Sequence, residues 1–576
     1  MQLSCDTPVP RRPLLGAIAA GLSAGCLQRA RTVANRSPTN QISLTIKTVP
    51  ADSDQIATEI ARTLATNLES VGIDVEIDLL TRDELYREIL INHEFDIYVA
   101  RAPDRNEPDF LRPLLHSQFA GEPGWQNPFG YSDLSMDEEL ERQRTTTGAR
   151  RRTAVFEVQR QIAREQPFTV LINPEYVGAT RTDRFDGWAE FDPTTPLSFL
   201  RLEPIEAAST LRTVITDDRI TRNFNPLSVE FRNQEAFTEL LYDPLAQPRD
   251  GDLDPWLATD WEWDESGGAT VRLREDLRWH DGNPLTAEDV AFTYRFLTDT
   301  ALGNADRRVP APRFRGRISL LEAVEAVDER TLQFEFGDTT PEVARRAFTV
   351  PILPAHEWES RATTVDVAGV DIADGITEAL VWSNPEPIGS GPLQFERRVA
   401  EQTLVLRRFD DHFLADASAD VDGPFAGGAP FDELDVRVVP SDETAIELLA
   451  ADEADATVTS VGPSVVSRIG RASDLQLQVT QTASFYHVGY NVREGPLGNP
   501  RFRRAIAGLL DKTALASDVF GGYGEPAAVP LSGTDWTPSS LQWNGQDPEV
   551  PFAGSDGELD VDRAREHFRE AGHQYT

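Results

Sequence analysis

The stretch Val271-Arg-Leu-Arg-Glu-Asp-Leu-Arg-Trp-His-Asp-Gly-Asn-Pro-Leu-Thr-Ala-Glu-Asp-Val290 decides how the middle of this chain folds. Its second half has the pattern of a strand end, a turn and a helix start. Asp-Gly-Asn-Pro is turn-forming, and Thr286 followed by Asp289 three positions later predicts a helix that begins with a capping box. We therefore interpret His280 as a structural residue of this motif rather than a catalytic or metal-binding one.

Outward from this stretch, strands and helices alternate along the chain. Alternating apolar residues predict strands, and apolar residues three to four positions apart predict helices. The expected strands cover residues 42–48, 73–79, 95–100, 168–172 and 210–216, and the expected helices cover residues 55–70, 82–91, 136–145, 150–165 and 234–241. This order predicts an α/β fold. We expect ligand contacts in the loop after residues 95–100, because open α/β sheets bind ligands at the carboxyl ends of their strands.

The charge of the chain excludes some classes of partner. Its 576 residues include 95 Asp plus Glu against 55 Lys plus Arg, a formal net charge of −40. Nucleic acid is excluded as the default partner, because a protein that binds it needs a basic face. Only Lys47 and Lys512 are lysines; the other basic residues are arginines. Acid excess with almost no lysine is typical of proteins that work in multimolar salt, so we expect a halophilic prokaryotic source, archaeal rather than bacterial.

Residues 1–41 have the pattern of an export signal and a tether. Arg11-Arg12 precede a short apolar run at residues 14–24, which ends in small residues before Cys26. The run is too short to span a bilayer and matches a signal peptide. The paired arginines resemble a twin-arginine (Tat) signal, and Cys26 resembles a lipobox cysteine, although Ser23 stands where leucine is usual. We expect a signal at 1–26, a tether at 27–41, and a lipoprotein anchored through Cys26 on the extracellular face of the membrane.

Several long segments carry a family resemblance. They are residues 240–245, 250–263 and 271–290, followed by Ile352-Leu-Pro-Ala-His-Glu, Pro387-Ile-Gly-Ser-Gly-Pro-Leu-Gln-Phe and Pro500-Arg-Phe-Arg-Arg-Ala-Ile. Together they resemble the family 5 extracellular solute-binding proteins, the dipeptide and oligopeptide receptors of ABC importers. The resemblance implies an α/β, periplasmic-binding-protein-like fold, with two main α/β lobes joined by a hinge and an extra lobe specific to the family.

The order of the segments suggests a circular permutation. Residues 43–79, Glu94-Phe-Asp-Ile, Asn106-Glu-Pro-Asp-Phe-Leu, Tyr131-Ser-Asp and 150–167 resemble the family's C-terminal portion, yet here they come first. We expect the old ends to be fused near residues 204–211, since chain termini often lie close together at the surface. The expected ligand-binding lobe is 42–175 plus 486–576, the main lobe 176–245 plus 385–485, and the extra lobe 246–384.

The resemblance also implies ligand-binding residues. In peptide-binding relatives an Asp in the loop after the third strand pairs with the ligand's α-ammonium group, and Asp104, followed by Asn106, matches it. Arg101 departs from the family, which often has Trp there; it pairs either with Asp104 or with a ligand carboxylate. Phe485, Tyr486 and Tyr490 lie where the family's strand crosses between lobes, so they line the cleft or belong to the core. A solvated loop acid is the alternative for Asp104.

The expected function is binding rather than catalysis. The sequence contains no nucleophile elbow, zinc-protease motif, phosphate-binding loop or cluster of metal ligands, so we expect no enzyme activity, no metal and no cofactor. The resemblance implies a monomer that captures peptides or similar small solutes and passes them to ABC permease subunits. Two alternatives remain: a sensor that signals to a membrane transducer, or a family member that binds nickel, haem or sugar.

Overall fold

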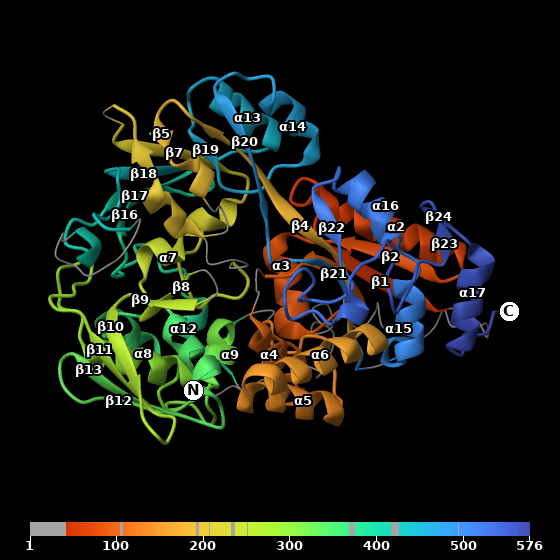
Figure 1. Ribbon diagram of the computed structural model, residues 1–576, viewed down its shortest axis with the longest axis horizontal. Helices are drawn as coiled ribbons and strands as arrows, with labels where there is room; N and C mark the ends of the chain where they lie inside the picture. The colour runs from red at the N-terminus through yellow and green to blue at the C-terminus, as the bar shows by residue number, and fades with distance from the viewer. Residues whose placement is uncertain are drawn as a thin grey trace, which may run out of the picture.

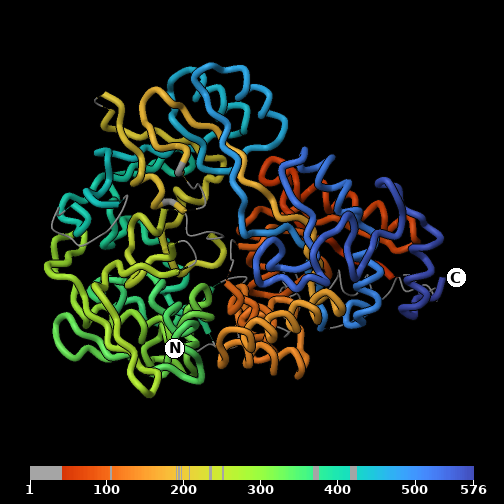
Figure 2. The backbone as a smooth tube through the Cα atoms, viewed as in Figure 1, coloured from red at the N-terminus to blue at the C-terminus, as the bar shows by residue number. Residues whose placement is uncertain are grey.

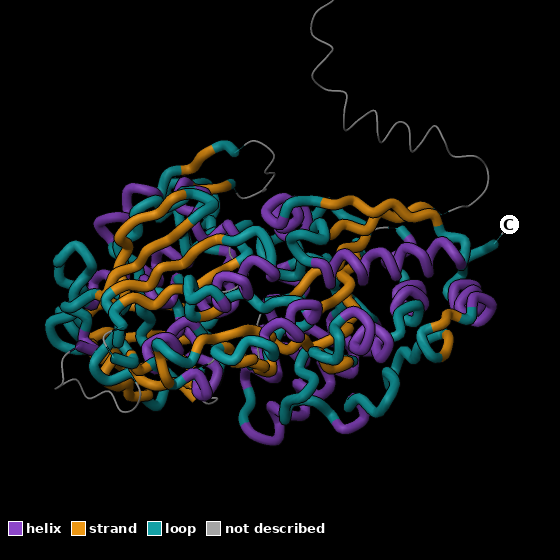
Figure 3. Tube along the Cα trace, turned by 90° about the horizontal axis from the view of Figure 1, so that it is seen from above, coloured by secondary structure: helices purple, strands orange, loops and turns teal. Residues whose placement is uncertain are grey.

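A computed structural model describes residues 42–103, 107–191, 195–206, 208–231, 237–249, 252–367, 375–415, 425–493 and 495–575. The predicted export signal, Cys26 and the tether lie outside the described residues, as do Asp104 and Asn106. The described chain has the predicted mixed α/β architecture (Figure 1), with strands in two groups and helices around them (Figure 3). None of its helices combines the length and the apolar character that crossing a membrane requires.

The first group of strands forms one half of a large sheet. Its order is β2 (Asp74–Leu79), β1 (Ser43–Thr48), β3 (Ile97–Arg101), β21 (Tyr486–Tyr490) and β4 (Phe168–Arg181). The first three strands are parallel, and β21 runs antiparallel to β3. The helix α2 (Gln55–Ser70) has its predicted bounds, while the predicted helix at 82–91 is α3 (Arg82–Tyr86) followed by a π-helix at Arg87–Asn92.

The strand β4 is much longer than the predicted strand at 168–172. Its first half pairs with β21 and β22 (Gly524–Pro526), and its second half pairs with β20 (Leu475–Gln481) and β19 (Ala456–Thr457). Asn173-Pro174-Glu175 interrupts the apolar run, which is why the sequence pattern ends early. The chain stays extended there because neighbouring strands supply its hydrogen bonds. Figure 1 shows β4 and β20 side by side between the two parts of the molecule.

The second half of the sheet has the order β16 (Leu393–Val399), β17 (Thr403–Arg408), β18 (Glu433–Val438), β7 (Thr210–Ile215) and β19. It is accompanied by α13 (Asp442–Ala450) and α14 (Pro463–Ile469). The predicted strand at 210–216 is confirmed as β7. Of the helix predicted at 234–241, only α7 (Thr238–Leu241) is helical in the structure, and residues 232–236 lie outside the described residues.

A separate four-stranded sheet contains the beginning of the stretch 271–290. Its order is β10 (Ala258–Trp263), β11 (Ala269–Leu273), β13 (Thr331–Phe336) and β12 (Leu321–Ala326). The predicted capping box is confirmed: the Thr286 amide donates to Asp289 at the start of α8 (Ala287–Thr298). His280 accepts from the Gly389 amide through Nδ1, and its Nε2 lies 3.0 Å from the Gly391 carbonyl, so its role here is structural.

The remaining elements are shorter or lie outside the sheets. They are α4 (Leu111–Leu115), α5 (Leu134–Thr145), α6 (Gly148–Glu165), α9 (Arg315–Ile318), α10 (Pro341–Ala344), α11 (Ala355–Trp358), α12 (Glu378–Val381), α15 (Pro500–Ala507), α16 (Lys512–Ala514), α17 (Val561–Glu570), and the paired strands β5 (Phe185–Asp186) with β6 (Glu203–Pro204), β8 (Ala246–Arg249) with β9 (Asp252–Pro255), β14 (Thr364–Val365) with β15 (Ile376–Thr377), and β23 (Gly554–Ser555) with β24 (Glu558–Leu559).

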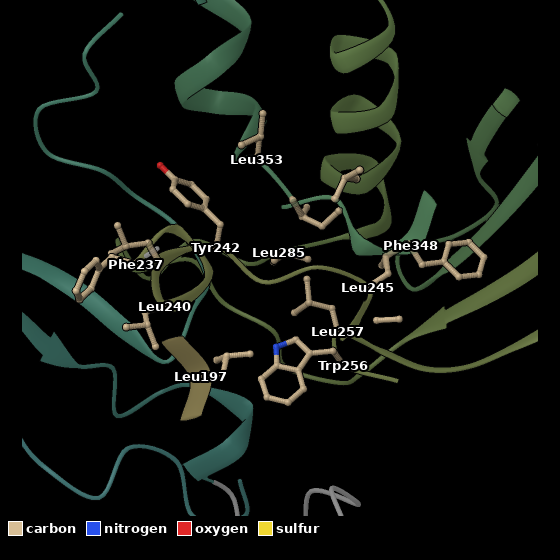
Figure 4. Close-up of a cluster of buried hydrophobic side chains, with 14 of the residues drawn as sticks. Leu197, Phe237, Leu240, Tyr242, Leu245, Trp256, Leu257, Leu285, Phe348 and Leu353 are labelled. Carbon is tan, nitrogen blue, oxygen red and sulfur yellow. The ribbon is translucent and has the colours of Figure 1, made fainter. Parts of the chain in front are cut away.

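Two large apolar cores divide the molecule. We call the part around β1, β2, β3 and β21, with α2, α5, α6, α15 and α17, the first lobe; it has a core of its own. We call the part around the second half of the sheet and the four-stranded sheet the double lobe, because one continuous core runs through both of its sheets. Figure 4 shows part of that core, with Leu257 next to Trp256. In Figure 2 the first lobe contains both the red and the dark blue segments of the chain.

Candidate functional site

A cavity of about 1520 Å³ lies between the first lobe and the second half of the sheet. Its floor includes Pro174, Glu175 and Tyr176 of β4, the strand that connects the two lobes. Its walls carry twelve carboxylates and four arginines, namely Asp52, Asp54, Glu59, Asp83, Glu84, Glu175, Asp217, Asp218, Asp442, Glu443, Asp511 and Asp518 with Arg82, Arg101, Arg219 and Arg222. Ligand sites commonly occupy clefts of this kind between domains.

The wall on the first lobe is built at the start of α2. Asp54 is the N-cap residue of this helix and accepts a hydrogen bond from the Ala57 amide at 2.9 Å. The Tyr486 hydroxyl donates to both carboxylate oxygens of Asp54, at 3.1 and 3.2 Å. Arg82, at the start of α3, donates to the Ser53 carbonyl at 2.6 Å. A tyrosine of β21 and a helix cap thus hold one carboxylate at a fixed place on the wall.

The opposite wall belongs to the second half of the sheet. Asp217 follows β7 and pairs with Arg219 at 2.6 Å. The Arg219 guanidinium also lies over the Tyr86 ring of the first lobe, 5.8 Å from its centroid. Asp442, at the start of α13, accepts from the Gly462 amide at 2.7 Å. Carboxyl ends of strands and starts of helices therefore face the cleft from both sides, as in other α/β ligand sites.

The two walls influence each other's ionisation across the cleft. Burial works to raise the pKa of the Asp217 carboxyl, but the charges of Arg219 and Arg82 lower it overall. Burial works to lower the pKa of Arg82, while Tyr86, Asp217 and Asp54 raise it overall. Burial raises the pKa of Asp442. The cleft therefore keeps fixed charges of both signs, an arrangement that suits a zwitterionic solute.

The structure separates the predicted site residues. Arg101 and Tyr486 both line the large cavity, and Arg101 donates to the Ser484 hydroxyl at 2.7 Å. Phe485 lines a second, smaller cavity on the other side of β21 from the cleft wall. Tyr490 lines neither cavity; it is fully buried in the first-lobe core, with its hydroxyl 2.8 Å from that of Thr169. Asp104 and Asn106 lie outside the described residues.

The residues on the two sides of the loop that carries Asp104 have different surroundings. Pro103 on one side lines the smaller cavity. On the other side, Glu107 forms ion pairs with Arg151 of α6 and with Arg346 of the double lobe. Asp109, which is 2 % exposed, accepts from Arg144 at 2.7 and 3.0 Å. The residues that follow the loop are therefore held by charge pairs that are partly removed from solvent.

Sequence reasoning missed most of the cleft walls. Asp54, Arg82, Asp217 and Asp442 are each ordinary members of a charge-rich sequence, and nothing in their neighbours marks them. The available signal was positional: all four sit at or just before a helix start that follows a strand, where α/β folds place ligands. Within the described residues there is no group of three or more His, Cys, Asp or Glu placed to hold a metal ion.

Comparison with a family model adds independent information. Residues 252–576, more than half of the chain, match the model described as bacterial extracellular solute-binding proteins, family 5 Middle. That stretch includes the four-stranded sheet, part of the second half of the large sheet, and β21 with the helices that follow it.

Individual relatives match a similar share of the chain. The oligopeptide-binding protein AppA of Bacillus subtilis is 25 % identical over 314 residues, which are 53 % of this chain and 49 % of AppA. Heme-binding protein A of Haemophilus influenzae is 23 % identical over 61 % of this chain and 60 % of its own. The chain thus spans about half to three fifths of the length of these relatives.

Among solved structures, that of AppA from B. subtilis in complex with a nonapeptide is similar at 20 % identity, over 64 % of this chain and 66 % of that one, with a TM-score of 0.47. The family model, with its match over more than half of the residues, decides the assignment. This chain belongs to the bacterial extracellular solute-binding proteins of family 5.

Proposed function

We propose that this protein is the substrate-binding component of an ABC importer and that it captures peptides or similar small solutes. The observation that carries the proposal is the large cleft, whose walls come from two lobes with separate cores. The strands β4 and β20 cross between those lobes and form a natural hinge. Closure of the cleft around a solute is then a rotation about two strands, which leaves both cores intact. Binding alone is the function, without turnover.

The charges of the cleft favour particular solutes. Carboxylates outnumber arginines twelve to four on its walls, so a solute with at least one ammonium group gains most. We assign the α-ammonium to Asp104 together with Asn106, and a carboxylate to Arg101, whose guanidinium the described residues bind only through hydroxyl groups. Tyr486 completes the contacts from the cleft wall, whereas Phe485, on the other side of β21, does not line the cleft. One relative is named heme-binding protein A, so we keep solutes other than peptides as candidates.

The setting of the protein follows from its terminal sequence. We place it on the extracellular face of the membrane of a halophilic archaeon, anchored through Cys26 and tethered by residues 27–41. There it works as a monomer and delivers its solute to ABC permease subunits. The acidic surface suits that setting, because in molar salt the repulsion between its charges is screened over about 3 Å.

We infer that the chain is a circular permutation of the family's usual order, with the lobe boundaries given above. Supporting contacts join the first and last described segments within the first lobe. Arg565 of α17 donates to the Ser70 carbonyl at the end of α2, and the Asn67 side-chain amide donates to the Leu509 carbonyl at 2.7 Å. The stretch where the old ends would be fused is exposed at residues 203–206. A permutant in the family's order should fold to the same cleft.

Mass spectrometry under non-denaturing conditions tests the proposed function. Protein purified in multimolar salt should retain a small solute, and calorimetric titration should give its affinity. An Asp104→Ala variant should lose at least about tenfold in affinity, because a charge pair in a closed cleft is lost. Asp410→Ala is the control, since Asp410 is 81 % exposed and does not line the cleft.

The outcomes separate the parts of the proposal. If no solute is retained and no peptide or cationic solute binds, the proposed function is wrong. If a solute binds but Asp104→Ala leaves its affinity unchanged, Asp104 is not part of the site.

A further inference from the structure

The segment 482–485 links β20 to β21 at the place where the chain passes between the two lobes. On β4, the pairing with β21 ends at Ile172 and the pairing with β20 begins at Glu175. Only Asn173 and Pro174 of β4 lie between these pairings, opposite the four linking residues. The regular ladder of hydrogen bonds between the strands is therefore interrupted here, as it is at a β-bulge.

Side chains bind the two crossing segments together where the ladder stops. The Thr482 hydroxyl donates to the Pro174 carbonyl at 2.7 Å. The Asn173 side-chain amide donates to the Ser484 carbonyl at 3.0 Å. Ser484 is fully buried, and Thr482 is half-buried on the wall of the large cavity. The hydroxyls of the linking segment thus have fixed places beside β4.

Arg101, the last residue of β3, lies against these two hydroxyls and also lines the large cavity. Its Nε donates to the Ser484 hydroxyl at 2.7 Å, and its Nη2 donates to the Thr482 hydroxyl at 3.4 Å. The two hydroxyl oxygens are 2.9 Å apart. Because Thr482 gives its only hydroxyl hydrogen to the Pro174 carbonyl, Ser484 donates in the contact between them. Both oxygens are then left to accept from the guanidinium.

The surroundings of Arg101 differ from those of the other cleft arginines. The others interact with carboxylates: Arg82 with Asp217 and Asp54, Arg219 with Asp217, and Arg222 with Asp83 and Asp218. The described residues form hydrogen bonds with the Arg101 guanidinium only through hydroxyl groups. A hydroxyl fixes the plane of a guanidinium without cancelling its charge. Among these four arginines, Arg101 is therefore the one whose charge is available to a solute.

The free part of this guanidinium suits a carboxylate. The two hydroxyls occupy the edge formed by Nε and Nη2, and the described residues accept no hydrogen bond from Nη1. Nη1 and the second hydrogen of Nη2 form an edge that matches the two oxygens of a carboxylate. Elsewhere on the walls a carboxylate meets mainly like charge, because twelve acidic side chains line the cavity.

We propose that Ser484 and Thr482 are positioning residues of the solute site: they hold the Arg101 guanidinium so that it binds a carboxylate of the solute through two hydrogen bonds. The inference rests on the proposed function, which assigns a carboxylate to Arg101 but not the groups that orient it. The two hydroxyls act through Arg101 rather than on the solute. Because they are bound to β4, which crosses between the lobes, the guanidinium keeps its orientation when the cleft closes.

Two pairs of peptides test the preference for a carboxylate by calorimetric titration in multimolar KCl. Ala-Ala-Ala and its C-terminal amide differ in the main-chain carboxylate, and the amides of Ala-Glu-Ala and Ala-Gln-Ala differ in a side-chain carboxylate. In at least one pair, the wild-type protein should bind the acid at least about tenfold more tightly than its neutral partner. Arg101→Gln should reduce this ratio to about one or below, because the acidic walls remain.

Variants of the two hydroxyls test the positioning. Ser484→Ala removes the acceptor of Nε and should reduce the ratio at least about threefold, while the affinity for the neutral peptide stays the same. Thr482→Val should reduce the ratio at least about twofold, whereas Thr482→Ser keeps the hydroxyl and should keep the wild-type ratio. Ser473→Ala is the control, because Ser473 is exposed and does not line the cavity.

The outcomes distinguish the inference from the proposed function. If peptides bind without a preference for either acid, or if Arg101→Gln keeps the preference, the inference is overturned while the proposed function stands. If Ser484→Ala keeps the preference or weakens both members of a pair equally, Ser484 does not position Arg101, and Thr482→Val decides the same question for Thr482. If no peptide and no retained solute binds at all, the proposed function fails, and the inference fails with it.

Discussion

The double lobe has two junctions, and they are chemically different. Inside it, the second half of the sheet and the four-stranded sheet share one apolar core, with Leu240 and Phe348 in the same cluster (Figure 4). At its contact with the first lobe, charged groups meet instead. Arg315 pairs with Glu122 at 2.6 Å, Arg87 pairs with Glu230 at 2.5 Å, and Arg346 pairs with Glu107.

This difference indicates which parts move as one body. Separating two halves of a shared apolar core exposes that core to water, which costs roughly 25 cal/mol for each Å². Separating charged groups exchanges their pairing for hydration, which offsets much of the loss, and salt screens the charges further. The double lobe should therefore stay rigid while the first lobe swings on β4 and β20. Polar contacts between domains are typical of such movable joints.

The largest expected effect comes from damage to the shared core. Leu257→Ala should lower the free energy of unfolding by about 2–5 kcal/mol, because Leu257 is 1 % exposed and its loss leaves a cavity. The shift of the urea midpoint, with an unchanged slope, measures the loss. Leu134→Ala, at a position that is 80 % exposed, should change it by less than about 0.5 kcal/mol. Equal losses in the two variants would contradict a shared core.

A smaller effect is expected at the charged contact between the first lobe and the double lobe. Glu107→Gln removes the charge that Arg346 and Arg151 share. This should weaken the contact between the first lobe and the double lobe by about 1.5–3 kcal/mol. Small-angle X-ray scattering should then show a larger radius of gyration without solute, while Leu257→Ala should leave that radius unchanged. Glu262→Gln, at an exposed position of β10, is the control. A radius that stays at the wild-type value would show that this pair does not hold the lobes together.

The dependence of stability on pH tests both parts of the molecule, because the first lobe and the double lobe each contain a histidine that burial keeps neutral. Burial lowers the pKa of His487 to about 3 and that of His280 to about 4. The unfolded chain takes up the proton near pH 6.5, so stability is complete above that pH and falls as the pH drops towards 3 or 4. Each histidine contributes a slope of about 1.4 kcal/mol per pH unit.

Urea unfolding at pH 7, 6 and 5 tests this slope. His487→Phe should remove one slope of about 1.4 kcal/mol per pH unit and leave the contribution of His280 in place. His356→Phe is the control, since its ring is 36 % exposed beside Asp281. An unchanged pH dependence in His487→Phe would mean that His487 titrates normally in the folded protein.

The sequence was most informative where a local pattern has a local cause. The helix at 55–70 and the capping box of Thr286 and Asp289 were predicted correctly, because helix periodicity and caps depend on neighbours in the chain. The strand at 168–172 was predicted too short, because the extension through Pro174 depends on pairing with β22 and β20, some 300 to 350 positions later. Among the predicted site residues, Arg101 and Tyr486 line the cleft, whereas the rest of its walls gave no signal.

By itself, the sequence determined the fold class, the family and the acidic, lysine-poor surface. These follow from composition, periodicity and long matching segments, which need no knowledge of distant contacts. Only the tertiary structure decided that two sheets share one core, that Asp54 and Asp217 face each other across a cleft, and that His487 is enclosed by five aromatic rings. Those facts depend on which segments meet in space, because a buried or unpaired atom is defined by neighbours that lie far away along the chain.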